Sequence, residues 1–182
     1  GNMNIGEEIA LRVDQVLLQD ALSTLTMQTL EAIELDRVLV QLACQYIDHN
    51  LLQTDFRNPD DHIYLQSCCA RYGIHFSKPG NGISHPTHQE NFGVPGQLLA
   101  GTDSHTPANG AIGMLAIGVG SVEGAAILSG ESLSVQMPEV MGVRLTGSLP
   151  SWVSAKDVVL ELLRRHSVRG AVGRVIEYYG DG

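Results

Sequence analysis

The sequence predicts an α/β domain in which helices cover both faces of a mostly parallel β-sheet. Segments with the two-residue period of strands alternate along the chain with segments of helical period, and this alternation is typical of sandwiched parallel sheets. Of the 182 residues, 43% are hydrophobic and 17% are charged. This composition excludes a disordered chain and suffices for one sizeable core, so we expect a single domain over residues 1–182.

The first part of the chain is expected to run from an extended segment through a helix to a strand. Branched apolar residues indicate the extended segment over 9–18, and alternation indicates a strand over Val38–Leu42. Asp20 can cap the helix between them, because aspartate accepts hydrogen bonds from the free amides of a helix start. The apolar side of this helix would be formed by Leu22, Leu25, Leu30 and Ile33.

The middle of the chain predicts two further helices, separated by a short strand and a turn. The Asn-Pro-Asp-Asp run at 58–61 starts the first of these helices, and Gly73 ends it. A short strand over 74–76 leads into a turn at 78–82, where proline and two glycines lie close together. His85 is then expected at the start of the next helix.

An apolar strand over 97–100 precedes a polar loop over 102–110 and the apolar stretch Ala111–Leu128. This stretch approaches the length of a membrane span, but it contains Glu123 and several glycines, so we interpret it as a buried, tightly packed helix. Its run Gly118–Gly124 resembles a dinucleotide-binding fingerprint. The glycine spacing differs from that fingerprint and no clear strand precedes it, which favours helix packing through small residues.

The last third of the chain predicts two strands that flank a helix. The strands are expected over Val140–Leu145 and Arg174–Tyr179, and Ser154 with Asp157 forms a capping box that opens the helix. The chain ends at Gly180–Gly182, directly after a strand-like run. From this ending we expect a piece of a larger protein.

Charge and cysteine content limit the classes of partner and compartment. The net charge of −9 argues against general binding of nucleic acids or anionic membranes. Cys44, Cys68 and Cys69 form neither a disulfide framework nor a C-x-x-C metal motif, and we expect a reduced, cytoplasmic compartment. No signal peptide is expected, because Glu7 and Glu8 stand where its apolar core would lie.

Chemically useful side chains gather in three loops that follow predicted strands. The first loop contains Asp48 beside His49, and a neighbouring carboxylate keeps an imidazole protonated to higher pH, as a general acid near neutrality requires. The second, Gly80–His85, allows the backbone to approach a ligand. The third, Gly101–Pro107, holds a carboxylate, a hydroxyl and an imidazole in succession. The alternatives are an exposed loop pair, a tight turn and a loop of helix-capping residues, respectively.

A serine-hydrolase role for Ser104 beside His105 is disfavoured. Side chains of adjacent residues seldom face each other well, and the G-x-S-x-G elbow of such enzymes is missing from the sequence.

Six stretches, spread across nearly the whole chain, follow one another in the same order as the matching stretches of a known protein family. They are Leu18–Ala21, Tyr46–His49, Lys78–His85, Gly101–Pro107, Gly142–Pro150 and Val175–Gly180. Together they resemble the aconitase family, specifically its first, catalytic α/β domain, and the Asp-Ser-His-Thr-Pro loop is the most specific of them. The resemblance implies a three-layer αβα domain of the aconitase iron-sulfur type and a hydro-lyase activity.

The resemblance also implies roles for individual residues. The predicted catalytic residues are Asp48, His49, His85, Asp103 and His105, and the predicted substrate-binding residues are Gln19 and Ser104. Asp48 and His49 resemble the acid pair near the leaving hydroxyl, and His85 and Asp103 a second histidine–carboxylate pair. His105 resembles a histidine held by a glutamate from later in the chain. Because successive loops meet at one end of a parallel sheet, the residues of the three loops should converge on one face.

A [4Fe-4S] cluster is the cofactor that the resemblance implies for the full-length enzyme, with one iron acting as a Lewis acid on the substrate. The three cluster cysteines of the family, its serine base and its substrate-binding arginines are expected beyond Gly182, so this chain itself should bind no metal. The expected partners are a small di- or tricarboxylate and the remaining aconitase domains, covalently attached or separate. Citrate and isocitrate, which interconvert through cis-aconitate, are the favoured substrates.

Two other functions remain open at this stage. A stand-alone, non-catalytic module that binds a small di- or tricarboxylate or a protein partner would also retain these loops. RNA binding, as in the iron-regulatory relatives, fits poorly with the net charge of −9. The isolated chain is expected to be folded and catalytically inactive.

Overall fold

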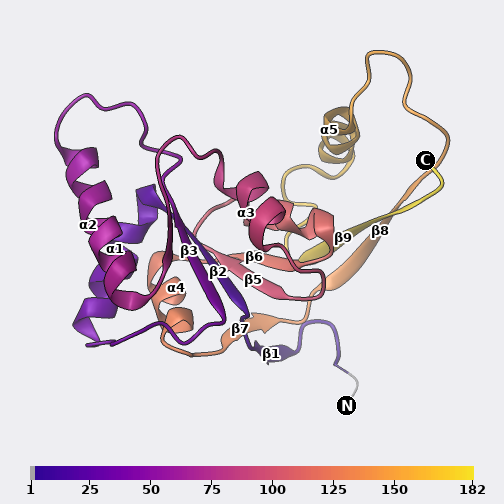
Figure 1. Cartoon of the computed structure of the whole chain (residues 1–182). Coiled ribbons are helices and arrows are strands. Elements are labelled where there is room, and N and C mark those ends of the chain that lie inside the picture. The colour runs from indigo at the N-terminus through magenta and orange to yellow at the C-terminus, as the bar shows by residue number, and fades with distance from the viewer. Residues whose placement is uncertain (1–2) are drawn as a thin grey trace. The chain divides into compact units, whose positions relative to one another are not determined.

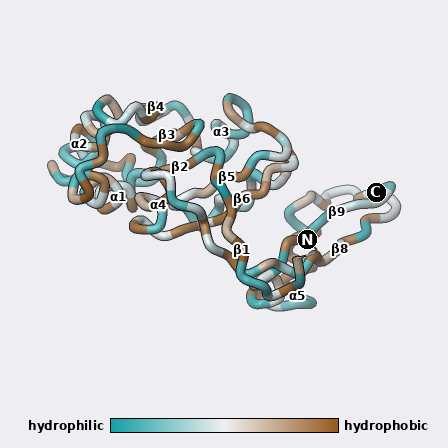
Figure 2. The backbone as a smooth tube through the Cα atoms, turned by 90° about the horizontal axis from the view of Figure 1, so that it is seen from below, coloured by the Kyte–Doolittle hydropathy of each residue, from teal (hydrophilic) through white to brown (hydrophobic). Residues whose placement is uncertain are grey.

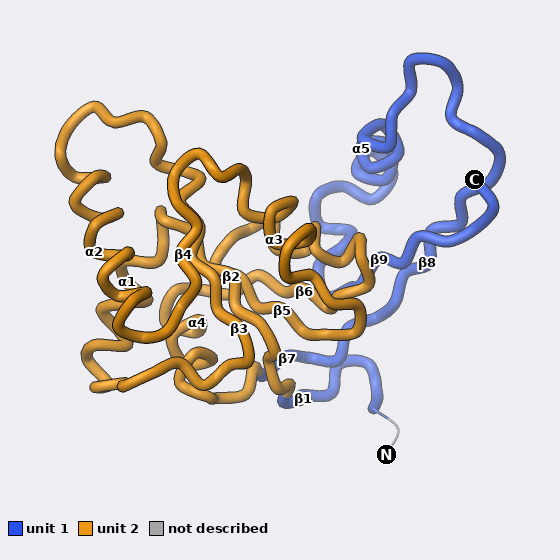
Figure 3. Tube along the Cα trace, viewed as in Figure 1, with its two compact units in different colours: residues 1–10, 134–182 blue, residues 11–133 orange. Residues whose placement is uncertain are grey.

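The computed structural model describes residues 3–182, which form two compact units (Figure 3). Unit 2 covers residues 11–133, and unit 1 combines the residues before 11 with residues 134–182. The expectation of a single domain over 1–182 stays a prediction.

Unit 2 is built on a five-stranded sheet with the order β4-β3-β2-β5-β6 (Figure 1). Its strands are β2 (Gln15–Gln19), β3 (Leu42–Tyr46), β4 (His75–Ser77), β5 (Leu98–Gly101) and β6 (Leu115–Gly118). All four neighbouring pairs are parallel, which confirms the predicted sheet type. Every residue of the central strand β2 is buried, as expected for a strand covered on both faces.

Helices form a layer on each face of this sheet. In one group, α1 (Asp20–Ala32) packs against both α2 (Arg57–Tyr72) and α4 (Ser121–Leu128). In a second group, α3 (Ser84–Phe92) packs against the 3₁₀ helix η1 (Thr106–Ile112). Both α1 and α3 contact β2. Leu17 of β2 packs in a core cluster with Phe92 of α3, so Val16 and Leu18 point to the opposite face. The three-layer αβα architecture is therefore confirmed.

Helix α1 differs from its prediction in both cap and buried face. The cap is Gln19, whose side-chain oxygen accepts from the amide of Ala21 at 2.6 Å, and the carboxylate of Asp20 makes other contacts. The buried residues are Asp20, Ser23, Thr26, Met27 and Leu30. The predicted apolar side was wrong apart from Leu30, because Leu22, Leu25 and Ile33 are about half exposed. Small hydroxyl side chains replace leucines at the interface, and Thr26 donates to the carbonyl of Ser121 at the start of α4.

Strand β3 begins at Leu42, so the predicted strand over Val38–Leu42 was placed too early. The amide of Val38 donates to the carbonyl of Tyr72 and that of Leu39 to the carbonyl of Leu128. These residues therefore bond to helix ends instead of a strand ladder. The predictions for the next segments are confirmed, including the end of α2 at Gly73, which adopts the left-handed conformation with φ 76°.

The stretch Ala111–Leu128 is not one helix. It contains the end of η1, the strand β6 and the helix α4, with Gly113 ending η1 in the left-handed conformation. A strand therefore does precede the run Gly118–Gly124. Packing through small residues is supported, because a Cβ added to Gly124 would lie 3.0 Å from Cγ2 of Thr102. No helix in the described residues is long and apolar enough to span a membrane.

Unit 1 contains two small two-stranded sheets and one helix. Strand β1 (Glu8–Leu11) pairs with β7 (Leu133–Gln136), and β8 (Glu139–Leu145) pairs in parallel with β9 (Arg174–Gly180). Strand β7 was not predicted. The helix α5 (Ala155–His166) starts with the predicted capping box, in which the amide of Ser154 donates to Asp157 at 2.8 Å.

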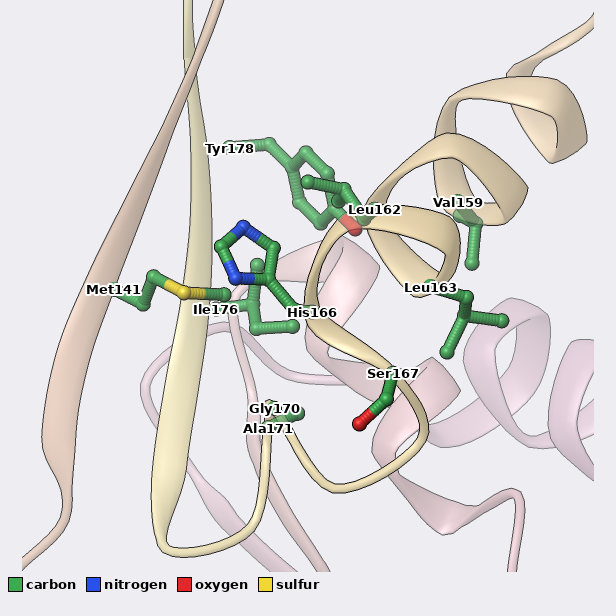
Figure 4. A pocket seen from close by; sticks show the side chains of 10 residues that line it. All are labelled: Met141, Val159, Leu162, Leu163, His166, Ser167, Gly170, Ala171, Ile176 and Tyr178. Carbon is green, nitrogen blue, oxygen red and sulfur yellow. The ribbon is translucent and has the colours of Figure 1, made fainter.

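Hydrophobic side chains in unit 1 line a small hollow between α5 and the strands β8 and β9 (Figure 4). Leu162, Leu163 and Ile176 give it an apolar character, and none of the predicted site residues lies in it. In unit 2 the hydrophobic colouring of β3 contrasts with the mostly hydrophilic α2 (Figure 2). The polar residues of interest all belong to unit 2.

Candidate functional site

The candidate site lies where three neighbouring parallel strands end. Strand β2 ends at Gln19, β3 ends shortly before Asp48, and β5 ends shortly before Asp103. These strands lie side by side in the order β3-β2-β5, so the residues after them share one edge of the sheet. The carboxyl edge of a parallel sheet is the usual place of ligand sites in α/β folds.

His49 lies between two carboxylates. Its Nδ1 is 2.8 Å from Oδ1 of Asp48, and its Nε2 is 3.1 Å from Oδ2 of Asp103. The side chain of His49 is 40% exposed, whereas both carboxylates are 4% exposed. Asp48 is fixed further by the amide of Ser84 at the start of α3, which donates to Oδ2 at 2.7 Å. An accessible imidazole is thus backed by two buried acids.

Asp103 joins His49 to a second histidine. Nε2 of His85 lies 2.7 Å from Oδ1 of Asp103, and Nδ1 of His85 lies 3.5 Å from the side-chain nitrogen Nδ2 of Asn109. His85 is buried, and Asp103 links it to the accessible ring of His49. The amide of His105 donates to the same Oδ1 at 2.7 Å and fixes the carboxylate from the backbone.

The remaining predicted residues lie at the border of this cluster. The ring of His105 is 79% exposed, with Nδ1 3.5 Å from Asp103, and the hydroxyl of Ser104 lies 3.5 Å from the same ring nitrogen. The convergence of the three loops is confirmed by these distances. Gln19 is buried, and its amide group donates to the carbonyl of Thr102 while accepting from Ala21. Its predicted contact with substrate, like the catalytic roles of the other residues, stays a prediction.

Three polar residues of the cluster were not predicted from the sequence to belong to the site. Asp20 accepts from the amides of the turn that carries His49, His62 approaches Asp20 at 3.3 Å, and Asn109 approaches His85. Asp20 was expected only to cap a helix. Its position directly after Gln19, within the stretch Leu18–Ala21 that resembles the aconitase family, was the feature of the sequence that could have indicated a place in the site.

The carboxylates determine the protonation state of His49. Partial burial alone would lower the pKa of His49, but the hydrogen bond and charge of Asp48, with the charges of Asp103 and Asp20, raise it above its ordinary value. Burial would raise the pKa of Asp103, but hydrogen bonds from His105 and His85 and the charges of His85 and His49 lower it. The site therefore keeps the imidazole of His49 protonated to higher pH than an ordinary histidine.

Two groups of three side chains bring atoms that could bind a metal ion within 4.8 Å of one another. They are His85 with Asp103 and His105, and Asp20 with Asp48 and His49. In both triplets the carboxylates already bond to imidazoles or to backbone amides. We therefore interpret them as a hydrogen-bonded acid–base network.

The cysteines of the described residues belong to neither triplet. Cys44, Cys68 and Cys69 are all buried. Burial raises the pKa of Cys44 to about 11 and that of Cys69 to about 12, so their reactive thiolate forms are disfavoured. These three residues do not fit the ligand set of an iron-sulfur cluster.

The model of the family described as "Aconitase family (aconitate hydratase)" matches residues 2–182 of this sequence. The chain belongs to the aconitase family. The sequence is similar to mitochondrial aconitate hydratases of Candida albicans and Saccharomyces cerevisiae, each 36% identical over 96% of the chain. It is similar to the same degree to the mitochondrial homocitrate dehydratase of Saccharomyces cerevisiae, also 36% identical over 96% of the chain.

The match covers nearly all of this chain but only a small part of each relative. The match takes in 96% of this chain but only 23–24% of the length of each relative. The chain thus spans about a quarter of the aconitase-family enzymes that it resembles. The five-stranded unit with its histidine–carboxylate cluster belongs to that quarter.

A further histidine of α3, His88, contrasts with those of the site. It is fully buried, with Nδ1 3.0 Å from the hydroxyl of Tyr46 and Nε2 2.8 Å from Oε1 of Gln15. The oxygen of Gln15 can only accept, so Nε2 carries the proton and Nδ1 accepts from Tyr46. Burial, with a smaller effect of the charge of His85, lowers the pKa of His88 to about 4.

We expect His88 to make folding stability depend on pH between 6.5 and about 4. In the unfolded chain it would protonate near pH 6.5, whereas in the fold it resists protonation down to about 4. Its contribution is therefore complete above pH 6.5 and is lost as the pH falls to about 4, by about 3 kcal/mol. Urea unfolding across this range should show a shallower pH dependence for His88→Gln than for the wild type. The exposed His75→Gln is the control, and equal slopes for His88→Gln and wild type would contradict the expectation.

Proposed function

We propose that this chain supplies the acid–base part of an aconitase-type hydro-lyase site. The reaction would be the reversible dehydration of citrate or isocitrate through cis-aconitate. The observation that carries the proposal is His49, an accessible imidazole held between the buried carboxylates of Asp48 and Asp103. The substrate class comes from the family and from relatives named aconitate hydratase and homocitrate dehydratase.

The chemistry of dehydration explains why such a histidine is useful. A carbon–hydrogen bond and a carbon–oxygen bond break, a double bond forms, and the hydroxyl leaves as water only if it receives a proton. His49 would donate that proton and recover it on rehydration. Its Nδ1 is held by Asp48 at 2.8 Å, whereas Nε2 has the longer contact of 3.1 Å to Asp103. The proton on Nε2 is therefore the one that we assign to transfer.

The other residues would support this transfer. His85 and Asp103 form the pair that keeps the second carboxylate ionised beside His49. The exposed Ser104 and His105 would meet substrate carboxylate or hydroxyl groups at the rim, and Gln19 would contact substrate through the amide hydrogen that it does not use within the fold. The base that removes the carbon-bound proton is assigned to residues outside this chain.

The cofactor of the family is assigned to the complete enzyme. A [4Fe-4S] cluster would supply Lewis-acid chemistry toward the substrate, and we propose that its thiolate ligands lie outside these 182 residues, in the remaining aconitase domains. The three buried cysteines are consistent with a compartment that keeps thiols reduced. A cytoplasmic location is our proposal, although the relatives named above are described as mitochondrial.

Anaerobic reconstitution tests the assignment of the cluster. When the purified chain is incubated with iron and sulfide, we expect no stoichiometric cluster, because Cys44, Cys68 and Cys69 are buried with raised pKa values. Visible absorbance and the iron and sulfide content after desalting are the measurements. A stoichiometric cluster, lost on replacement of these cysteines by serine, would contradict the prediction.

Hydration of cis-aconitate by the complete enzyme tests the function itself. The proposal predicts loss of the ultraviolet absorbance of the double bond, with formation of citrate or isocitrate. Turnover of cis-homoaconitate alone would instead assign the substrate to the homocitrate type. Binding of tricarboxylates without turnover by the complete protein would favour the non-catalytic module.

A further inference from the structure

Asp20, the first residue of α1, bonds to a turn of the candidate site in addition to lying at a helix start. Its side chain is fully buried (0% exposed) and is surrounded by the turn that follows β3. The amides of Asp48 and His49 donate to Oδ1 at 3.1 and 3.0 Å, and the amide of Asn50 donates to Oδ2 at 2.8 Å. Three consecutive backbone amides therefore converge on one carboxylate. Hydrogen bonds to a charged acceptor are stronger than those to a neutral one.

The turn has few other constraints. The amide of Ile47 is the last one before it to bond across the sheet edge, to the carbonyl of Ser77. The residues that follow the turn, 51–56, are exposed and precede α2. Two other contacts act on the turn, the bond between the Asp48 side chain and the amide of Ser84 and the bond from the side-chain amide of Gln53 to the carbonyl of Asn50. The three backbone amides of the turn, at 48–50, all bond to Asp20.

A second histidine completes the surroundings of this carboxylate. Nε2 of His62, from the first half of α2, lies 3.3 Å from Oδ2 of Asp20, and its side chain is 12% exposed. Nδ1 of His49 lies 3.8 Å from Oδ1. The titratable groups that face Asp20 in the described residues are therefore Asp48, His49 and His62. Asp20 also lies in the first turn of α1, where the helix dipole favours a negative charge.

We infer that Asp20 is a positioning residue, which fixes the turn at 48–50 so that the ring of His49 spans Asp48 and Asp103. The inference rests on the proposed function only for its catalytic consequence, since the positioning itself is a property of this chain. Burial would raise the pKa of Asp20, but the hydrogen bonds from Asn50, His49 and Asp48 hold it below its ordinary value. The carboxylate is thus ionised over the working range of the site.

Asp20→Asn is the informative variant, because it keeps the shape and removes the charge. An asparagine has one acceptor oxygen and an NH₂ group that can only donate. One of the two oxygens of Asp20 would therefore be replaced by a donor that faces other donors, either the amides of Asp48 and His49 or the amide of Asn50 together with Nε2 of the His62 ring. The turn should loosen and His49 should lose a neighbouring charge.

The matched control is Asp14→Asn at the other end of β2. Asp14 also accepts from a backbone amide, that of Leu98 at 2.9 Å, and lies just before β2 as Asp20 lies just after it. It belongs to the opposite edge of the sheet from His49. Both variants lose a carboxylate that bonds to the backbone, so a change in the pKa of His49 that follows merely from such a loss beside β2 should appear in both.

The experiment is NMR titration of the imidazole nitrogens in the 182-residue chain labelled at histidine. We expect the pKa of His49 to fall toward its ordinary value in Asp20→Asn and to stay at its wild-type value in Asp14→Asn. A wild-type pKa and ring tautomer of His49 in folded Asp20→Asn would overturn the inference.

Hydrogen exchange in the wild-type chain gives a second test that does not depend on the folding of the variant. The amides of residues 48–50 should exchange at least about tenfold more slowly than those of 51–53 in the same loop, relative to their intrinsic rates. Equal protection of the two groups would overturn the inference.

In the complete enzyme, Asp20→Asn should lower kcat more than it raises KM and should move the basic limb of the pH profile to lower pH. Normal kinetics together with a lowered pKa of His49 would count against the catalytic role of His49 and leave the positioning by Asp20 intact. The two proposals therefore fail separately.

Discussion

Replacing His49 by glutamine in the complete enzyme is expected to lower kcat by about 10²–10⁴-fold, the usual contribution of a general acid. Glutamine can donate from its NH₂ group to only one of the two carboxylates. Asp48 nevertheless keeps the amide of Ser84 as a donor, and Asp103 keeps the ring of His85 and its bond from the amide of residue 105. Glutamine cannot transfer a proton to the leaving hydroxyl. Because that proton is needed in the transition state, KM should change far less than kcat.

Steady-state hydration of cis-aconitate measures this effect, with His75→Gln as the matched control. His75 is an exposed histidine at the first residue of β4 and pairs with Cys44 in the middle of β3, before the strand ends at which the candidate site lies. The control should retain wild-type kcat. Activity of His49→Gln within twofold of wild type would remove His49 from the mechanism.

The convergence of the site could be predicted from the sequence because it depends on the order of strands and loops. The alternating pattern placed the strand before Asp48 and His49 too early, and a brief apolar run located the strand before Asp103, but both loops still follow parallel strands, which bring such loops to one edge. The contact between His49 and Asp103, 54 positions apart, follows from this topology.

The failures of the sequence analysis have two physical causes. In α1 the buried face includes Ser23 and Thr26, whose hydroxyls donate to the carbonyls of Gln19 and Ser121, whereas Leu22, Leu25 and Ile33 of the pattern are about half exposed. The apolar stretch Ala111–Leu128 concealed strand β6, whose residues are exposed or partly buried, because a short apolar strand and an apolar helix segment have the same hydrophobicity. Periodicity alone does not separate these cases.

The role of Asp20 was missed for a different reason. An aspartate at a helix start normally caps its own helix, and the sequence shows nothing of the turn 28 residues later that donates to it. The cap function passed to Gln19, which left the carboxylate free for that turn. Only the packing of β3 beside β2 brings the two together.

Asp103→Asn in the complete enzyme is expected to have the second large effect, a loss of kcat on the order of 10²-fold or more, as for other changes that disable acid–base catalysis. Asp103 contacts Nε2 of His49 at 3.1 Å and Nε2 of His85 at 2.7 Å. Both histidines donate to it when His49 is protonated. An asparagine has only one oxygen, so its NH₂ group would face one of these N–H groups.

The pH profile separates this effect from a general loss of structure. The charge of Asp103 helps to raise the pKa of His49, so its removal should lower that pKa. A general acid must be protonated, and activity should therefore decline at lower pH on the basic side of the profile than in the wild type. Asp55→Asn, which changes an exposed aspartate in the loop before α2, should leave both kcat and the profile unchanged. A wild-type basic limb in Asp103→Asn would show that Asp103 does not control the proton on His49, and the site would then operate through Asp48 alone.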